Sequence, residues 1–177
     1  MNEILLSIIA ASAGFMAKSL WDQYADKKKS IELDLWKIRV QDVETRLREF
    51  LWPIYLRLQR DNVIWEKILH RDSGDPEKQK VAYQIETSVI LPNHVEIISL
   101  IESGMHFVRD DKELENALLA YMRHIDVYRS IRAAGILEKD PIYFGEPYPD
   151  GFFQVIEDRV RKQQKKYDDI LSEKTNG

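Results

Sequence analysis

The stretch WKIRVQDVETRLREFLWPI, residues 36–54, decides the fold. Its large apolar side chains recur at steps of four, three, four, three and four residues: Trp36, Val40, Val43, Leu47, Phe50 and Ile54. Charged side chains fill most of the positions between them. Residues three and four apart share one face of an α-helix, so the spacing predicts a long helix with one buried face. We place this helix over residues 30–69 and expect a kink at Pro53, where proline interrupts the backbone hydrogen bonds.

Similar spacing predicts further helices downstream. Steps of four and three relate Leu114, Leu118, Tyr121, Ile125 and Tyr128, and steps of three and four relate Phe153, Ile156, Val160, Gln163, Tyr167 and Ile170. We expect helices over about 77–90, 94–108, 111–134 and 152–172. No stretch shows the alternation that is typical of a β-strand. The predicted fold class is therefore all-α: a short N-terminal membrane-type helix, the long heptad-patterned helix and an antiparallel helical bundle.

Four signals mark the boundaries of these helices. Pro92 disfavours helix at the residue before it, and Asn93 with Glu96 three residues later has the pattern of a capping box. Asp110 or Asp111 can cap the next helix, and Gly135 is placed to end it.

Composition narrows the classes of protein that the chain can belong to. Its 177 residues are 44% apolar and 32% charged, which is ordinary for one globular domain with a sizeable core. The chain has no cysteine, so it holds neither disulfides nor a thiolate zinc site, which favours a reducing compartment. A net charge of −4 argues against a surface built to neutralise phosphates, and nucleic acid is not an expected partner.

The N-terminal stretch ILLSIIAASAGFMAK, residues 4–18, predicts a membrane anchor. Its uncharged part would span about 21 Å as a helix, and about 27 Å if Lys18 snorkels and the helix continues to Trp21. Trp21 and Tyr24 would join Lys18 in an interface belt, and the lysines at 27–29 would orient the chain. We therefore expect an anchor over residues 1–24 and a cytoplasmic domain over 25–177, single-pass in the cytoplasmic membrane.

Two other interpretations of this stretch stay open. It could be a cleaved secretory signal, although no lysine or arginine precedes its apolar core, or a buried helix of a soluble protein. Small residues on the stretch would allow two such helices to approach closely, which predicts a homo-oligomer: Ser7, Ala10, Ala11, Gly14 and Ala17.

The segment ILEKDPIYFGEPYPDGFF, residues 136–153, contains three prolines and has no helical period. Long ordered loops are uncommon and are often functional. Its aromatic rings could plug the open end of the bundle, which we favour, or the loop could recognise a ligand or partner. The candidate recognition residues are Tyr143, Phe144, Glu146, Tyr148 and Asp150.

Motifs for catalysis are absent from the sequence. It contains no glycine-rich phosphate loop, no G-x-S-x-G elbow and no H-E-x-x-H. Glu102 and His106 share one helical face, but their spacing differs from the Glu-x-x-His of di-iron bundles, so we predict neither metal nor cofactor.

These observations predict a membrane-anchored, self-associating, non-enzymatic protein that presents its bundle to a partner protein, with a membrane-acting effector as a variant. The alternative is a soluble bundle oligomer, or an enzyme or sensor with a site between the helices and the 136–151 loop.

Overall fold

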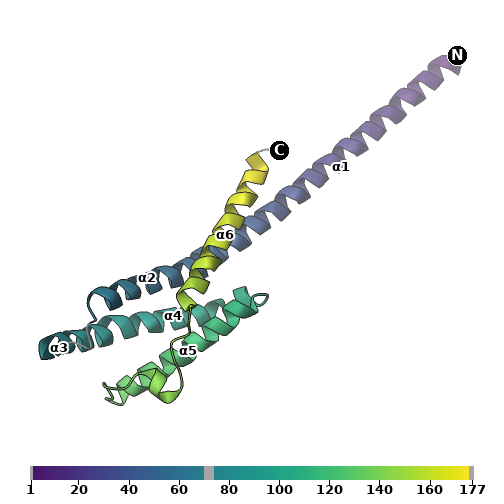
Figure 1. The fold of residues 1–177 in the computed structure, drawn as a ribbon. Helices are drawn as coiled ribbons and strands as arrows, with labels where there is room; N and C mark the ends of the chain where they lie inside the picture. Colours follow the sequence, from purple (N-terminus) through teal and green to yellow (C-terminus); the bar gives the residue numbers. More distant parts are fainter. Residues whose placement is uncertain (1, 70–73, 176–177) are drawn as a thin grey trace. The chain divides into compact units, whose positions relative to one another are not determined.

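The computed structural model describes residues 2–69 and 74–175, with side chains described at residue 16 and over residues 18–69 and 74–174. Every regular element in these ranges is helical, which confirms the all-α class. In chain order (Figure 1), they are α1 (Asn2–Arg46), η1 (Leu47–Leu51), α2 (Trp52–Lys67), α3 (Pro76–Ile85), η2 (Glu86–Ile90), α4 (Leu91–Gly104), η3 (Met105–Val108), α5 (Lys112–Ala133), η4 (Pro141–Phe144) and α6 (Phe152–Thr175).

The chain divides into two compact units. Unit 1 contains α1 up to Asp42 and the end of α6 from Ile170, and unit 2 contains residues 43–169. Within unit 1, the indole Nε1 of Trp36 donates to the carbonyl of Ile170 at 3.0 Å, and Lys174 Nζ lies 4.3 Å from the centre of the Trp36 ring. Trp36 therefore ties the two segments of unit 1 to each other.

The heptad-spaced side chains form the core of unit 2. In the heptad-spaced series that begins at Trp36, the residues from Val43 to Ile54 are at least 95% buried. The five heptad-spaced residues of α5, from Leu114 to Tyr128, are buried to the same extent. Tyr121 stacks on Phe152 at the start of α6, with ring centroids 4.5 Å apart and planes 14° apart. Phe50 lies directly over Gly104 of α4, where a Cβ would come within 2.2 Å of its ring. Each such apolar side chain contributes about 1.5–3 kcal/mol to folding when it is buried.

Both prolines inside helical segments are accommodated by wide turns. Pro53 follows the π-helical turn η1, and Pro92 follows the π-helical turn η2. A proline ring clashes with the carbonyl four residues earlier, here that of Glu49 or Ser88, and both residues lie in these wider turns. The helix therefore continues through both prolines, whereas the sequence predicted a break at Pro92. Asn93, the predicted N-cap, is buried within α4.

Helix ends follow the chemistry of the residues there. Asp111 accepts a hydrogen bond from the backbone N–H of Leu114 at 3.1 Å and caps α5. It is one of the two aspartates that the sequence offered as this cap. Gly135 follows the end of α5 with a φ of 73°, a left-handed conformation that favours glycine. Asp75 caps α3 in the same way as Asp111, through the N–H of Glu77.

The prediction of a single-pass protein in the cytoplasmic membrane is wrong. Across the residues that the structure describes, no helix is both long and apolar enough to span a bilayer. The physical reason lies in α1, a helix of 45 residues that runs on through Lys18, Asp22 and Asp26. The uncharged run before Lys18 is shorter than the ~20 residues that a span requires.

The structure describes the side chains of the predicted interface belt but not those of the predicted oligomer face. Trp21 and Tyr24 of the expected interface belt are 70% and 64% exposed, and their ring centroids are 6.3 Å apart. Lys18 is exposed too. The side chains of the predicted oligomer face lie outside the described part of the structure: Ser7, Ala10, Ala11, Gly14 and Ala17.

Candidate functional site

A buried acidic side chain lies on the core face of α2. Asp61 follows Ile54 and Leu58 at steps of four and three, so it occupies the next position of the same face, and only 7% of it is exposed. Asn93 of α4 donates its Nδ2 to Asp61 Oδ2 at 2.7 Å. The other oxygen, Oδ1, is buried and has no hydrogen-bond partner among the described residues. Unit 2 therefore contains an unsatisfied acceptor, a state that costs about 1–3 kcal/mol.

The surroundings of Asp61 shift its ionisation. Burial raises the pKa of Asp61 to about 6, because the carboxylate loses its hydration. The hydrogen bond from Asn93 and the charges of Arg60 and Arg57 lower the pKa and offset part of this effect. Both arginines donate to Asn93 Oδ1, Arg57 at 3.0 Å, and thereby fix the orientation of the amide. At neutral pH, Asp61 is therefore mainly ionised.

His94 of α4 lies beside Asp61 of α2. Its Nδ1 is 2.7 Å from the hydroxyl oxygen of Tyr121 and 3.6 Å from Asp61 Oδ2. Burial is the main cause that lowers the pKa of His94 to about 4, and the neighbouring His124 contributes to the same shift. The imidazole is therefore neutral at pH 7. Burial also raises the pKa of the Tyr121 hydroxyl well above its ordinary value, so that group keeps its proton.

His124 of α5 connects the helices to the loop between α5 and α6. Its Nδ1 lies 2.9 Å from the backbone carbonyl oxygen of Glu146. A carbonyl can only accept, so Nδ1 carries the hydrogen of this hydrogen bond. The Tyr148 ring meets His124 edge to face at 5.3 Å and Tyr121 edge to face at 6.0 Å. Tyr148 and Glu146 are therefore the loop residues that close onto the helices.

These side chains surround a cavity of about 500 Å³ within unit 2. Its walls come from α2, η2, α4, α5 and the loop: Leu58, Asp61, Asn62, Trp65, Ile90, His94, His124, Tyr128, Asp140, Pro141, Ile142 and Tyr148. Most of the wall is aliphatic or aromatic, and the polar groups are few. Small-molecule sites in proteins typically combine this composition with a volume of roughly 300–1,000 Å³.

A buried ion pair supports one side of the cavity. Glu86 of η2 is fully buried, and Arg132 Nε donates to its Oε1 at 2.5 Å. The Tyr128 hydroxyl donates to the same oxygen. Arg132 Nη1 also donates to the loop carbonyls of Ile136 at 2.8 Å and Lys139 at 2.6 Å. The loop is thus held from the core by Arg132.

The other predicted recognition residues lie away from the cavity. Tyr143 and Phe144 are 67% and 48% exposed, and Lys139 Nζ lies 4.1 Å from the centre of the Tyr143 ring. Asp150 is exposed. The carboxylate of Glu146 faces Arg123 at 3.5 Å. The structure therefore brings Tyr148 to the cavity wall, bonds the backbone of Glu146 to His124, and leaves Tyr143, Phe144 and Asp150 outside the wall.

No sequence motif indicated Asp61 or Asn93 as site residues. The signal that could have found Asp61 is its position, because a carboxylate continues the apolar steps of Ile54 and Leu58. Glu86 gives a similar signal, since it stands between Ala82 and Ile90 on the core face of its helix.

The chain matches no protein-family model, no curated protein and no solved structure. The chemistry of the cavity is therefore the basis for a functional interpretation. No group of three or more His, Asp or Glu side chains in the described residues is arranged to hold a metal ion. His106, considered above with Glu102, is exposed and bonds the backbone carbonyl of Ser103 at 3.1 Å. Asp61, whose Oδ1 is buried without a hydrogen-bond partner among the described residues, is one of the few polar residues in this mainly apolar and aromatic wall.

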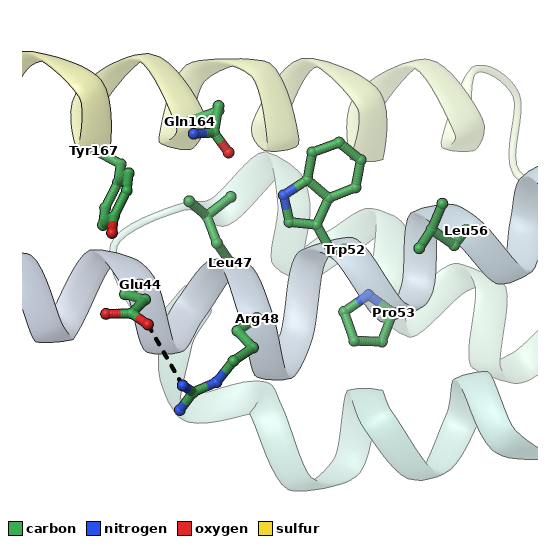
Figure 2. Close-up of a pocket in the computed structure, with 8 residues that line it drawn as sticks. All are labelled: Glu44, Leu47, Arg48, Trp52, Pro53, Leu56, Gln164 and Tyr167. Atoms are coloured by element: carbon green, nitrogen blue, oxygen red, sulfur yellow. Dashed lines mark hydrogen bonds and ion pairs between the residues drawn. The ribbon is translucent and has the colours of Figure 1, made fainter.

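A second hollow lies between α6 and the segment around η1 (Figure 2). It measures about 390 Å³ and is lined by Glu44, Leu47, Arg48, Trp52, Pro53, Leu56, Gln164 and Tyr167. Figure 2 shows one ion pair there, between Arg48 and Glu44 at 3.4 Å, and both side chains are largely exposed. This hollow lacks the buried polar groups of the first cavity, so we assign the candidate site to the cavity at Asp61.

Proposed function

We propose that unit 2 is a ligand-binding module that takes up a small apolar molecule carrying a protonated amine. The observation that carries this proposal is the buried Asp61 Oδ1: this oxygen has no hydrogen-bond partner among the described residues, and Asp61 is one of the residues that line the cavity. A ligand N–H group directed at this oxygen removes the cost of the unsatisfied acceptor. A charged donor gains more than a neutral one, because Asp61 is mainly ionised at neutral pH.

The remaining walls favour a cation over an anion. Two carboxylates, Asp61 and Asp140, line the cavity, and none of its described lining residues is a lysine or an arginine. Asp140 faces Arg132 at 3.2 Å, so Asp61 is the carboxylate left for a ligand. Tyr128, Tyr148 and Trp65 supply ring faces and edges, and aromatic faces attract cations.

Binding explains the arrangement better than catalysis does. The Nδ1 atom of His94 bonds the Tyr121 hydroxyl and that of His124 bonds a loop carbonyl. These bonds fix both rings as parts of the wall. Because the loop over the cavity is held by His124 and Arg132, occupation of the cavity can change the order of the loop, as in a sensor.

The full chain and two probes of the same size test this proposal. We expect 2-phenylethylamine to raise the melting temperature of the wild type at pH 7.5 and to change tryptophan fluorescence, since Trp65 lines the cavity. The neutral 2-phenylethanol should bind more weakly. Asp61→Asn keeps the size of the side chain and should abolish the preference for the amine.

A matched control is Asp126→Asn, which removes an exposed carboxylate of α5 that lies 4.0 Å from Arg129. This variant should bind the amine like the wild type. Equal shifts by the amine in Asp61→Asn and in the wild type would contradict the proposal.

We also propose, as a second candidate, a self-associating non-enzymatic protein that presents the antiparallel bundle to a protein partner. The specific observation in its favour is the row of exposed apolar side chains on α1, several of which are more than 60% exposed. Sedimentation of the full chain over a range of concentrations tests it, and a monomer at every concentration would contradict it.

A further inference from the structure

Eight large apolar side chains in the described part of α1 lie exposed in unit 1. Their exposed fractions are between 39% and 70%: Met16, Leu20, Trp21, Tyr24, Ile31, Leu33, Leu35 and Ile38. Trp36 of the same helix is part-buried against Ile170 and Lys174. The contacts within unit 1 therefore use one face of α1 and leave these side chains uncovered.

Five of the exposed residues fall on one heptad stripe. From Trp21 to Tyr24, Lys28, Ile31, Leu35 and Ile38 the steps are three, four, three, four and three. In heptad letters, positions a are Trp21, Lys28 and Leu35, and positions d are Tyr24, Ile31 and Ile38. Trp36 and Val40 then take positions b and f, on the other side of the helix. The stripe is thus a coiled-coil seam distinct from the one that packs inside the protein.

The charges beside the seam select its partner. In a parallel, in-register pair, each g residue meets the e residue five positions later on the other chain. Here g Lys27 meets e Glu32, and g Asp34 meets e Arg39. Both pairs are of opposite charge, and two-fold symmetry forms each pair twice.

The antiparallel alternative is less favourable. In the antiparallel register that pairs each a position with a d position of the other chain, Lys27 meets Asp34, which is attractive. In the same register Arg39 meets Lys18, which is repulsive. The single charged seam residue, Lys28, lies 3.9 Å from Glu32 of its own helix, so its ammonium group can leave the seam. A lysine at one a position fixes register at some cost in stability.

We propose that residues 21–38 of α1 form a parallel, in-register, two-stranded coiled coil with a second copy of this chain. This inference specifies the surface for the self-association put forward as the second candidate function, and it rests on that candidate. The seam is about two and a half heptads long, so we expect a weak dimer that forms with increasing concentration.

Single cysteines test the pairing directly, because the chain has none of its own. Ile31→Cys places a thiol at a d position, where a parallel in-register dimer brings two copies of residue 31 together. Ser30→Cys, its neighbour on the outer face, is the matched control. Under mild oxidation of the full chain, Ile31→Cys should give a covalent dimer and Ser30→Cys should stay a monomer. Equal cross-linking of the two variants would overturn the proposal.

A mixture of Lys28→Cys and Ile31→Cys chains separates the two orientations, since an antiparallel pair brings residue 28 to residue 31. Cross-linking only in this mixture would overturn the parallel arrangement.

Charge reversal provides an independent readout. Lys27→Glu should weaken dimerisation about fivefold, because it replaces two attractive pairs by repulsive ones, and adding Glu32→Lys should restore most of the affinity. An unchanged dissociation constant in Lys27→Glu would contradict the proposed charge pairs. If the wild type self-associates but Ile31→Cys does not cross-link, this surface is wrong and the second candidate function stands. If the wild type is a monomer at every concentration, both the proposed coiled coil and the second candidate function are wrong.

Discussion

Replacing Asp61 by asparagine should expose a pH dependence of stability that the wild type hides. Asp61 has a pKa of about 6 in the folded protein, above its ordinary value of about 4, so the folded state holds this proton more tightly than the unfolded state. Its contribution to stability is therefore fully present below pH ~4 and is lost as the pH rises through about 6. Two pKa units correspond to about 3 kcal/mol.

His94 acts in the opposite sense. Its pKa is about 4 in the folded protein, below the ordinary value of about 6.5, so the folded state holds the proton less tightly. Stability from this group is present above pH ~6.5 and is lost as the pH falls through about 4, again by about 3 kcal/mol. Between pH 4 and 6 the two contributions nearly cancel in the wild type.

Each variant should therefore uncover the contribution of the other residue. With Asp61→Asn, the free energy of unfolding should rise by about 3 kcal/mol from pH 4 to 6.5, and with His94→Gln it should fall by a similar amount. Urea unfolding followed by circular dichroism at several pH values measures both slopes. The exposed Asp126→Asn is the control and should parallel the wild type. Profiles of Asp61→Asn and His94→Gln that both parallel the wild type would refute the reasoning.

Two further substitutions test the packing. Gly104→Ala should destabilise the protein by about 1–3 kcal/mol, because its Cβ would meet the ring of Phe50, whereas Gly74→Ala, with open space around it, should have little effect on urea unfolding. Arg132→Ala should cost about 3–5 kcal/mol, since it breaks the buried ion pair with Glu86, and Glu86→Gln added to it should recover part of that loss in thermal unfolding.

The helical class and the core positions could be predicted from spacing alone. Heptad steps from Val43 to Ile54 and through α5 identify side chains that are buried in the structure. Spacing works here because a helix repeats its geometry, so sequence distance determines which side chains share a face. The end of α5 could be predicted too, because Gly135 has the left-handed backbone conformation that favours glycine after a helix.

Local sequence signals fail where tertiary packing decides the structure. Asn93 has the chemistry of an N-cap, but the wide turn η2 carries the helix past Pro92, and its amide is instead used by Asp61 and Arg57. The N-terminal stretch has anchor-like composition, yet it continues into a charged helix. The sequence offered a site between the helices and the 136–151 loop as an alternative, but it could not identify Asp61, His94 and His124, because they come from three helices and only packing brings them together.

The most direct test of the account is the ionisation of Asp61 itself, followed by NMR of the side-chain carboxyl carbon in the full chain. Without ligand, the account predicts a pKa of about 6 for this group. With saturating 2-phenylethylamine, the pKa should fall, because an ammonium group bound at Oδ1 stabilises the carboxylate. A pKa near 4 that the amine leaves unchanged would contradict both the buried acceptor and its proposed ligand.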